Sequence, residues 1–421
     1  MEQLINMTDA VFLGRVGEVE LGASALACMY YLAIYMLGFG FGLGVQVMVA
    51  RKNGEGRLQD TGRIFWQGQY FLIGLSATVC LLSELFSPIL LRRIISSEAV
   101  RQAVTDYVSW RCYGLFFAFP VLVFRSFFVG ITKTKVLIVN SILMVLANVV
   151  LNFLLIFGYG GLPAMGIAGA GLASSLAEGF SLLFFILYTG KKVNSIRYGL
   201  NAVYDFRLLW QLTKMSVWTM IRSFICVIPW LLFFVIIEHL GETQLAVANI
   251  IRNVFTIFFV ILNSFATTTS ALVSNLLGAG ERQYILSLCR KVIRLSYLVG
   301  VPFVLLALLG ANYVLRIYTG DETLLREAFL PYIVMLSSYF LSVPGYTYCN
   351  AVIGTGHTRI AFLFQAMTIL VYLVYLYILS LYPSLPLAIY WTADYLYALL
   401  LFVFSYHYMC THEQFKARLV L

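Results

Sequence analysis

The chain has 421 residues, of which 61% are hydrophobic and only 11% are charged, and its formal net charge is +9 at neutral pH. Soluble domains carry about 45–50% apolar and about 25% charged residues. This composition excludes a water-soluble fold and indicates a bundle of membrane helices, because backbone polar groups in lipid must be satisfied within each segment. At roughly 30–35 residues for each span and its loop, the length accommodates about twelve helices.

The excess of basic residues does not indicate nucleic-acid binding, because these residues lie in the loops between apolar runs, where they set membrane orientation. The seven cysteines and four histidines form no metal-binding pattern, and no nucleotide-binding loop or nucleophile motif is present. We therefore expect no enzyme activity, no structural metal, no cofactor and no nucleic-acid partner.

Eleven apolar runs are long enough to span a membrane. They cover residues 23–50, 64–90, 107–131, 136–157, 166–190, 215–238, 245–276, 293–318, 329–353, 360–382 and 384–409. Residues 1–14 precede them and are equally apolar, but as a helix they reach only about 20 Å against a hydrocarbon core of about 30 Å. We expect this numbering to begin inside span one, with about 20 or more residues before it in the working protein.

Orientation can be predicted from the loops, once residues 1–14 are counted as span one and the loops are assigned alternately to the two sides. One side then carries 18 Lys and Arg residues and the other carries 6. By the positive-inside rule, both termini lie in the cytoplasm and the protein is a multi-pass protein of the cell (inner) membrane.

The sequence repeats itself once, weakly but in register, across a shift of 224 positions. Residues that match across this shift are Gly17 and Gly241, Glu18 and Glu242, Gly54 and Gly278, Pro120 and Pro344, and Gly130 and Gly354. The shift carries span one onto span seven, which predicts two parallel six-helix lobes around a central cleft, an architecture typical of transporters. The N-terminal lobe is residues 1–190, the cytoplasmic linker 191–214, and the C-terminal lobe with its cytoplasmic tail 215–421.

Four segments of the first lobe resemble the multidrug and toxic compound extrusion (MATE) family in order and spacing. They are NMTDAVFLGRVGEVELGASALA at 6–27, GFGFGLGVQVMVARKNGEGR at 38–57, RSFFVGITKTK at 125–135 and NVVLNFLLIFGYGGLPAMGIAGAGLASSLAE at 148–178. The resemblance continues more loosely through LGETQLAVANI at 240–250 and NAVIGTGHTR at 350–359. It implies two six-helix lobes, alternating access, and export of drug-like, often cationic compounds driven by inward Na⁺ or H⁺.

The chain departs from one branch of that family, whose members carry a glutamate within span seven and an aspartate within span ten. No acidic residue occurs here between Met215 and Ile237 or between Phe329 and Ile353, and Cys226 stands near the expected glutamate. The resemblance therefore points to the first lobe for coupling. There the aspartate of span one is kept as Asp9, and a second aspartate of some members is replaced by Asn152.

Asp9 is the strongest candidate for cation coupling, because an acid near the middle of a membrane costs about 2.5–3.5 kcal/mol and usually has a partner or a function. Asn148 and Asn152 are four residues apart, so they share one helical face and each can offer a carbonyl oxygen. Such a group can exchange a proton or bind Na⁺. The structural alternative is that Asp9 only forms hydrogen bonds to a neighbouring helix.

Glu178 lies near the centre of span six, and reading back in steps of four gives Ser174, Ala170 and Gly166. Small residues at this spacing mark a close helix contact, so Glu178 is expected to point into protein. It could join Asp9 in cation coupling or attract a cationic substrate. Equally, it could form a hydrogen bond to span five or an ion pair with an arginine.

Asp394 of span twelve lies among aromatic residues that include Tyr390, a setting that suits an organic cation. The alternatives are that these aromatics anchor the span at the interface, and that Arg222 or Arg252 neutralises Asp394.

Because Arg222 falls within two turns of the predicted cytoplasmic end of span seven, we expect its side chain to reach toward the interface. Pro229 is expected to kink the same span.

Together these features predict a cation-coupled antiporter that exports amphipathic, often cationic small molecules by alternating access. The predicted partners are the small-molecule substrates and membrane lipids, H⁺ or Na⁺ is the coupling ion, and the working unit is a monomer. The alternatives are a lipid-linked saccharide flippase of the same superfamily, which usually lines its cleft with many Arg and Lys residues, and a channel.

Overall fold

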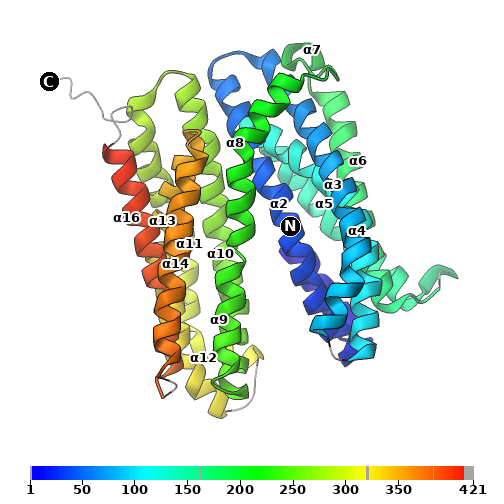
Figure 1. Ribbon diagram of the computed structural model, residues 1–421, viewed down its shortest axis with the longest axis vertical. Helices are drawn as coiled ribbons and strands as arrows, with labels where there is room; N and C mark the ends of the chain where they lie inside the picture. Colours follow the sequence, from blue (N-terminus) through cyan, green and yellow to red (C-terminus); the bar gives the residue numbers. More distant parts are fainter. Residues whose placement is uncertain (1, 96, 162, 319–321, 383, 412–421) are drawn as a thin grey trace. The chain divides into compact units, whose positions relative to one another are not determined.

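The computed structural model describes residues 2–95, 97–161, 163–318, 322–382 and 384–411. Every regular element in these ranges is a helix, which confirms the predicted all-α fold (Figure 1). Two compact units make up the chain: the first contains Met1–Asn53 and Arg57–Met220, and the second contains Gly54–Gly56 and Ile221–Leu421.

Sixteen α-helices and two 3₁₀ turns form this part of the chain. Up to the end of the eighth helix they are α1 (Glu2–Leu13), α2 (Glu18–Gly54), α3 (Leu58–Ile94), α4 (Glu98–Gly130), α5 (Lys135–Phe157), η1 (Tyr159–Gly161), α6 (Gly166–Lys192), α7 (Ser195–Tyr198) and α8 (Phe206–Ile225). The remainder are α9 (Ile228–Glu238), α10 (Glu242–Gly278), η2 (Arg282–Tyr284), α11 (Ile285–Leu309), α12 (Ala311–Tyr318), α13 (Glu322–Gly354), α14 (Thr358–Ser380), α15 (Leu387–Trp391) and α16 (Ala393–Thr411).

Eleven helical stretches among the described residues are long and apolar enough to cross a membrane, in agreement with the eleven predicted runs. The helix α1 precedes them as a twelfth, shorter element. The largest difference concerns span seven, which extends over Phe206–Glu238 where the hydropathy pattern indicated only 215–238. The hydropathy pattern did not identify the start of this span, because polar residues such as Asp205 and Arg207 flank its amphipathic first turn.

The helix bounds repeat with the shift found in the sequence. Both α2 and α10 have 37 residues, both α4 and α13 have 33, and in each pair the first and last residues are 224 positions apart. Pro120 of α4 and Pro344 of α13 occupy the same position within their helices. The internal repeat therefore describes the helical structure as well as the sequence.

In the first unit, α4 packs between α3 and α6, α6 also packs against α5, and α1 lies against both α5 and α6. Gly114 of α4 and Gly171 of α6 allow the closest approach, since a Cβ at Gly114 would overlap the Ser175 hydroxyl and one at Gly171 would crowd the Tyr107 carbonyl. The outer faces of α3 and α5 expose apolar side chains suited to lipid, including those of Leu81, Leu85, Ile138, Ile142 and Val150.

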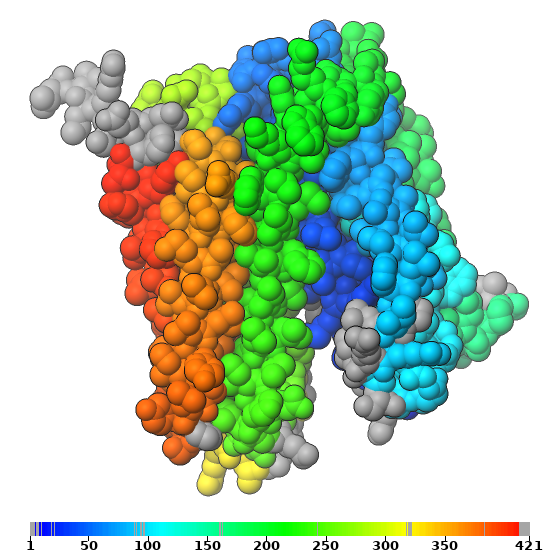
Figure 2. Space-filling view, viewed as in Figure 1, coloured from blue at the N-terminus to red at the C-terminus, as the bar shows by residue number. Residues whose placement is uncertain are grey.

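In the second unit, α13 is central and packs against α10, α11 and α16, while α14 packs against α16 and α9. Figure 2 shows α14 (orange) and α9 (green) side by side on one face of this unit. Span seven is interrupted here: α8 ends at Ile225 and α9 begins at Ile228, with Pro229 in the first turn of α9. Proline cannot donate a backbone hydrogen bond and clashes with the preceding turn, which accounts for the break.

The expected position of Arg222 at the cytoplasmic end of span seven is wrong. Arg222 lies sixteen residues from either end of the Phe206–Glu238 stretch, in the last turn of α8, and only 6% of its surface is exposed. The prediction failed because the span begins earlier than its hydropathy suggests.

Candidate functional site

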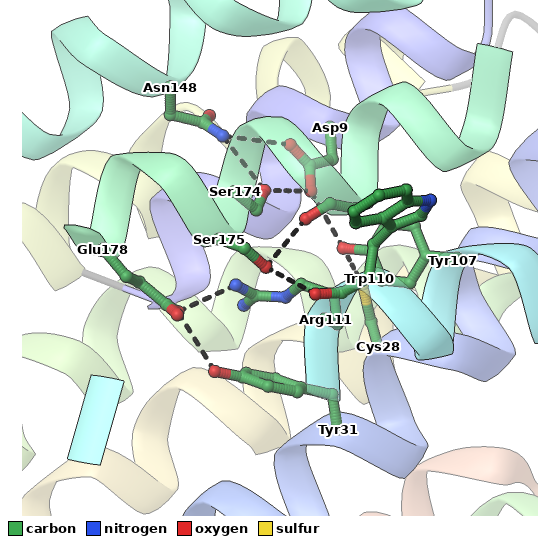
Figure 3. A network of polar contacts seen from close by, with 11 residues as sticks. Asp9, Cys28, Tyr31, Tyr107, Trp110, Arg111, Asn148, Ser174, Ser175 and Glu178 are labelled. Carbon is green, nitrogen blue, oxygen red and sulfur yellow. Dashed lines mark hydrogen bonds and ion pairs between the residues drawn. The ribbon is translucent and has the colours of Figure 1, made fainter. Parts of the chain in front are cut away.

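The buried polar centre of the first unit is built around Asp9 of α1, whose side chain is fully buried (Figure 3). Each neighbouring helix contributes polar side chains four residues apart: Tyr107 and Arg111 from α4, Asn148 and Asn152 from α5, and Ser174 and Glu178 from α6. Residues at this spacing share one helical face. Each of the three helices therefore presents a polar face to the interior of the first unit.

Four donors surround the Asp9 carboxylate. Its Oδ1 accepts hydrogen bonds from the side-chain amides of Asn152 (2.8 Å) and Asn148 (3.3 Å). Its Oδ2 accepts hydrogen bonds from the hydroxyls of Tyr107 (2.9 Å) and Ser174 (2.8 Å). An ionised carboxylate has about four lone-pair positions and no proton to donate, so this arrangement fits the charged form of Asp9.

The two asparagines of α5 also contact each other, since the Asn152 amide lies 3.3 Å from the Asn148 side-chain oxygen. Asn148 donates a further hydrogen bond of 3.0 Å to the Ser174 hydroxyl. The side-chain oxygen of Asn152 is buried and has no hydrogen-bond partner within the described part of the chain. A buried carbonyl oxygen beside a carboxylate belongs to the ligand type that hard cations prefer.

Glu178 lies one turn along α6 from Ser174 and contacts Arg111 and Tyr31. Its Oε1 accepts hydrogen bonds from Arg111 (2.7 Å) and from the Tyr31 hydroxyl (3.0 Å). The Arg111 guanidinium also stacks 3.8 Å from the centroid of the Tyr31 ring. Both charged side chains are at most 2% exposed, so the ion pair is shielded from solvent. Of the alternatives considered for Glu178, the structure therefore shows the one in which it forms an ion pair with an arginine.

Sequence reasoning brought Asp9, Asn148 and Asn152 together correctly as a group, but it assigned no role to Arg111 or Tyr107. The four-residue spacing of polar residues in the sequence was a signal for both Arg111 and Tyr107. Tyr107 and Arg111 are four residues apart on α4, as are Ser174 and Glu178 on the facing helix α6. Arg111 is close enough to Asp9 for its charge to act on that carboxylate as well as on Glu178. It therefore stands between the two acids (Figure 3).

The predicted substrate residues of the second unit lie at the start of its last span. Tyr390 is fully buried and its hydroxyl donates a 3.0 Å hydrogen bond to the Leu379 carbonyl, which ties α15 to the end of α14. Asp394 is partly buried in the first turn of α16. Among the described residues it forms no ion pair with Arg222 or Arg252, so neither arginine neutralises it by direct contact.

Comparison with known proteins connects this fold and site to a family. The profile of the MatE family matches residues 1–154 and 219–378. The chain is 24% identical over 281 residues to the probable multidrug resistance protein NorM of Agrobacterium fabrum, a segment that covers 66% of this chain and 60% of that protein. It is 23% identical over 362 residues to the NorM protein of Thermotoga maritima, with 85% and 77% covered.

Among solved structures, the outward-facing conformation of a multidrug resistance MATE family transporter superposes with a TM-score of 0.88. The two chains are 17% identical, and the superposition covers 96% of this chain and 91% of the other. The likeness at this identity concerns the fold, and the family match extends over most of the sequence. The chain belongs to the MatE, or multidrug and toxic compound extrusion, family of membrane transporters.

Proposed function

We propose that this chain is a cation-coupled antiporter that exports amphipathic, often cationic small molecules in exchange for H⁺ or Na⁺. The observation that carries the proposal is the Asp9 carboxylate, fully buried and held by four hydrogen-bond donors from α4, α5 and α6. A proton or a bound sodium ion would compensate the negative charge of this carboxylate. The multidrug resistance names of the relatives support drug-like substrates.

The two candidate ions would use the site differently. A proton would neutralise Asp9 and break one of its four hydrogen bonds, since a protonated oxygen no longer accepts in that direction. A sodium ion would need oxygen ligands, so the amides of Asn148 and Asn152 would have to turn their carbonyl oxygens toward Asp9. Glu178 would take part through Arg111, whose positive charge faces both acids.

On the substrate side, we propose that Asp394 attracts the positive charge of a substrate. Among the described residues, no ion pair or hydrogen bond satisfies this carboxylate, which leaves its charge available to a ligand. Tyr390 would contribute only its ring, because its hydroxyl already donates to the Leu379 carbonyl. The predicted lobes 1–190 and 215–421, joined by a cytoplasmic linker at 191–214, would alternate access around the substrate, with a single chain as the working unit.

Purified protein in liposomes, with Na⁺ and pH gradients imposed separately, tests this function. We expect ethidium to move against its own gradient when one of the two ions moves down its gradient. The gradient of the other ion, imposed alone, and a membrane potential of equal size, imposed alone, serve as controls. Ethidium movement that only follows its own concentration difference, at a rate independent of either cation gradient, would instead indicate a channel.

The predicted orientation can be tested with cysteines introduced at two positions outside the candidate spans, Gly160 and Ser195, in a background lacking the seven native free cysteines. An impermeant thiol reagent added outside intact cells should label Gly160→Cys and should spare Ser195→Cys until the cells are opened, because the positive-inside rule places Ser195 in the cytoplasm. Labelling of Ser195→Cys but not Gly160→Cys from outside would reverse the topology.

A further inference from the structure

Five basic side chains lie at one end of the helix pair α5 and α6 in the first unit, and all five are exposed. Lys133 and Lys135 flank the start of α5, Lys191 and Lys192 are the last residues of α6, and Arg197 belongs to α7. Because α7 follows α6 after only two residues, these side chains come from three consecutive turns of structure. We call them the basic corner.

The basic corner is continuous in space because α5 and α6 are antiparallel neighbours. Asn140 of α5 donates a 2.8 Å hydrogen bond to Ser181 of α6, and further along α5, Asn148 donates a 3.0 Å hydrogen bond to Ser174. Residue numbers therefore rise along one helix as they fall along the other. The start of α5 consequently lies on the same side of the unit as the end of α6.

The residues next to these basic side chains hold the corner in place. Val136, Val193 and Tyr198 are buried in one hydrophobic cluster, and each directly follows a member of the basic corner in the chain. In addition, the Lys133 ammonium lies 5.2 Å from the centre of the Tyr198 ring, a cation–π contact between the start of α5 and α7. The backbone that carries the five charges is therefore fixed by packing, while the charges themselves remain accessible.

Few acids accompany this positive charge. Residues 107–204 contain a single acid, Glu178, which is buried in an ion pair. On α3, which packs against α7, Asp60 already forms a 2.6 Å ion pair with an arginine. The positive-inside rule accounts for basic residues on this side of the membrane, but the basic loops 51–63 and 278–294 include acids of their own. The corner therefore carries an excess of positive charge that orientation alone does not require.

Apolar side chains continue from the basic corner along both helices. Ile138 and Ile142 of α5 and Leu183 and Ile186 of α6 are each at least half exposed, as expected for helix faces that meet lipid chains. In α7, Ile196 is 83% exposed although it lies within the basic corner. A positive patch at the end of exposed apolar faces has the arrangement of an anionic phospholipid, whose charged headgroup sits above its acyl chains.

We propose that the basic corner binds the headgroup of an anionic phospholipid with two phosphates, of the cardiolipin class, whose acyl chains lie on the outer faces of α5 and α6. Basic sites between membrane helices recognise such headgroups, and lysine binds phosphate as a point charge. The lysines come as two pairs from two helices, one pair for each phosphate. The assignment is independent of the exported substrate and of the coupling ion.

Native mass spectrometry of the purified, delipidated chain provides the test, because it counts bound lipids and gives their affinities. Cardiolipin, phosphatidylglycerol and phosphatidylethanolamine with the same acyl chains are titrated separately. We expect the wild-type protein to bind cardiolipin most tightly and phosphatidylethanolamine most weakly. Lys191→Gln with Lys192→Gln should weaken cardiolipin binding about 30-fold. Adding Lys133→Gln and Lys135→Gln should reduce it to the level of phosphatidylethanolamine, and all four positions are exposed, so the fold should tolerate the changes.

Arg290→Gln with Lys291→Gln is the matched control, since these two residues form an adjacent, exposed basic pair of α11 in the second unit. This variant should bind cardiolipin as the wild-type protein does. An equal loss in the control would show that binding follows net charge and would overturn the site, as would unchanged cardiolipin binding by the fourfold lysine variant.

Two further outcomes concern the identity of the ligand. Equal wild-type affinities for cardiolipin and phosphatidylglycerol would overturn the assignment of a headgroup with two phosphates. Inorganic pyrophosphate, added at the same concentration as cardiolipin, should leave the lipid bound, because it has no chains to pack on α5 and α6. Displacement of the lipid by pyrophosphate would instead assign the basic corner to a soluble phosphate compound and would overturn the proposal.

Discussion

Asp9→Asn should reduce gradient-driven export to the level of empty liposomes while the protein still folds and binds dye. The substitution removes the charge that a coupling cation must compensate, and it preserves the size of the side chain. An asparagine carbonyl can keep the hydrogen bonds from Asn148 and Asn152. Its amide can donate to Tyr107 and Ser174, whose hydroxyls can accept as well as donate. The local structure therefore survives the change.

The comparison is best made in the complete protein, with export in liposomes and dye binding in detergent measured on the same preparation. Asp106→Asn is the control, because Asp106 is an acid of α4 beside Tyr107 whose carboxylate accepts a hydrogen bond from Gln102 on the exposed side of the helix. It should export normally. Wild-type gradient-driven export by Asp9→Asn would remove Asp9 from the coupling mechanism.

Removing either partner of the Arg111–Glu178 ion pair should destabilise the first unit strongly. The pair is buried, so Glu178→Gln leaves the Arg111 charge without a carboxylate, and Arg111→Gln leaves Glu178 without its cation. Breaking one side of a buried pair costs about 3–5 kcal/mol, whereas replacing both partners often costs much less. The double variant Arg111→Gln with Glu178→Gln should therefore be more stable than either single variant.

Thermal or denaturant unfolding in detergent is measured for the wild-type protein, the two single variants and the double variant. These four proteins form a double-mutant cycle that isolates the interaction energy between Arg111 and Glu178. Arg101→Gln and Glu98→Gln provide the control cycle, because this pair lies in the first turn of α4, where both side chains are accessible to solvent. It should show a coupling of less than about 1 kcal/mol. Additive effects for Arg111 and Glu178, without recovery in the double variant, would show that the buried contact contributes little.

Several properties of the protein follow from the sequence by itself. The apolar runs determined the helical class, since a membrane leaves few other structures for such segments. The shift of 224 residues determined the repeated helix bounds of α2 with α10 and of α4 with α13. The spacing of Asn148 and Asn152 placed both on the face of α5 that meets Asp9, because helix periodicity is a local property.

The partners of the charged residues were decided by the tertiary structure. Sequence could not tell whether Glu178 joins Asp9 or pairs with an arginine, because the answer depends on how closely α4 approaches α6. That distance is set by the absence of side chains at Gly114 and Gly171. In the same way, Arg222 was misplaced because charge and hydropathy locate a span end only to within a few turns. Its burial involves α13, whose Cys349 contacts it although the two residues are 127 positions apart in the chain.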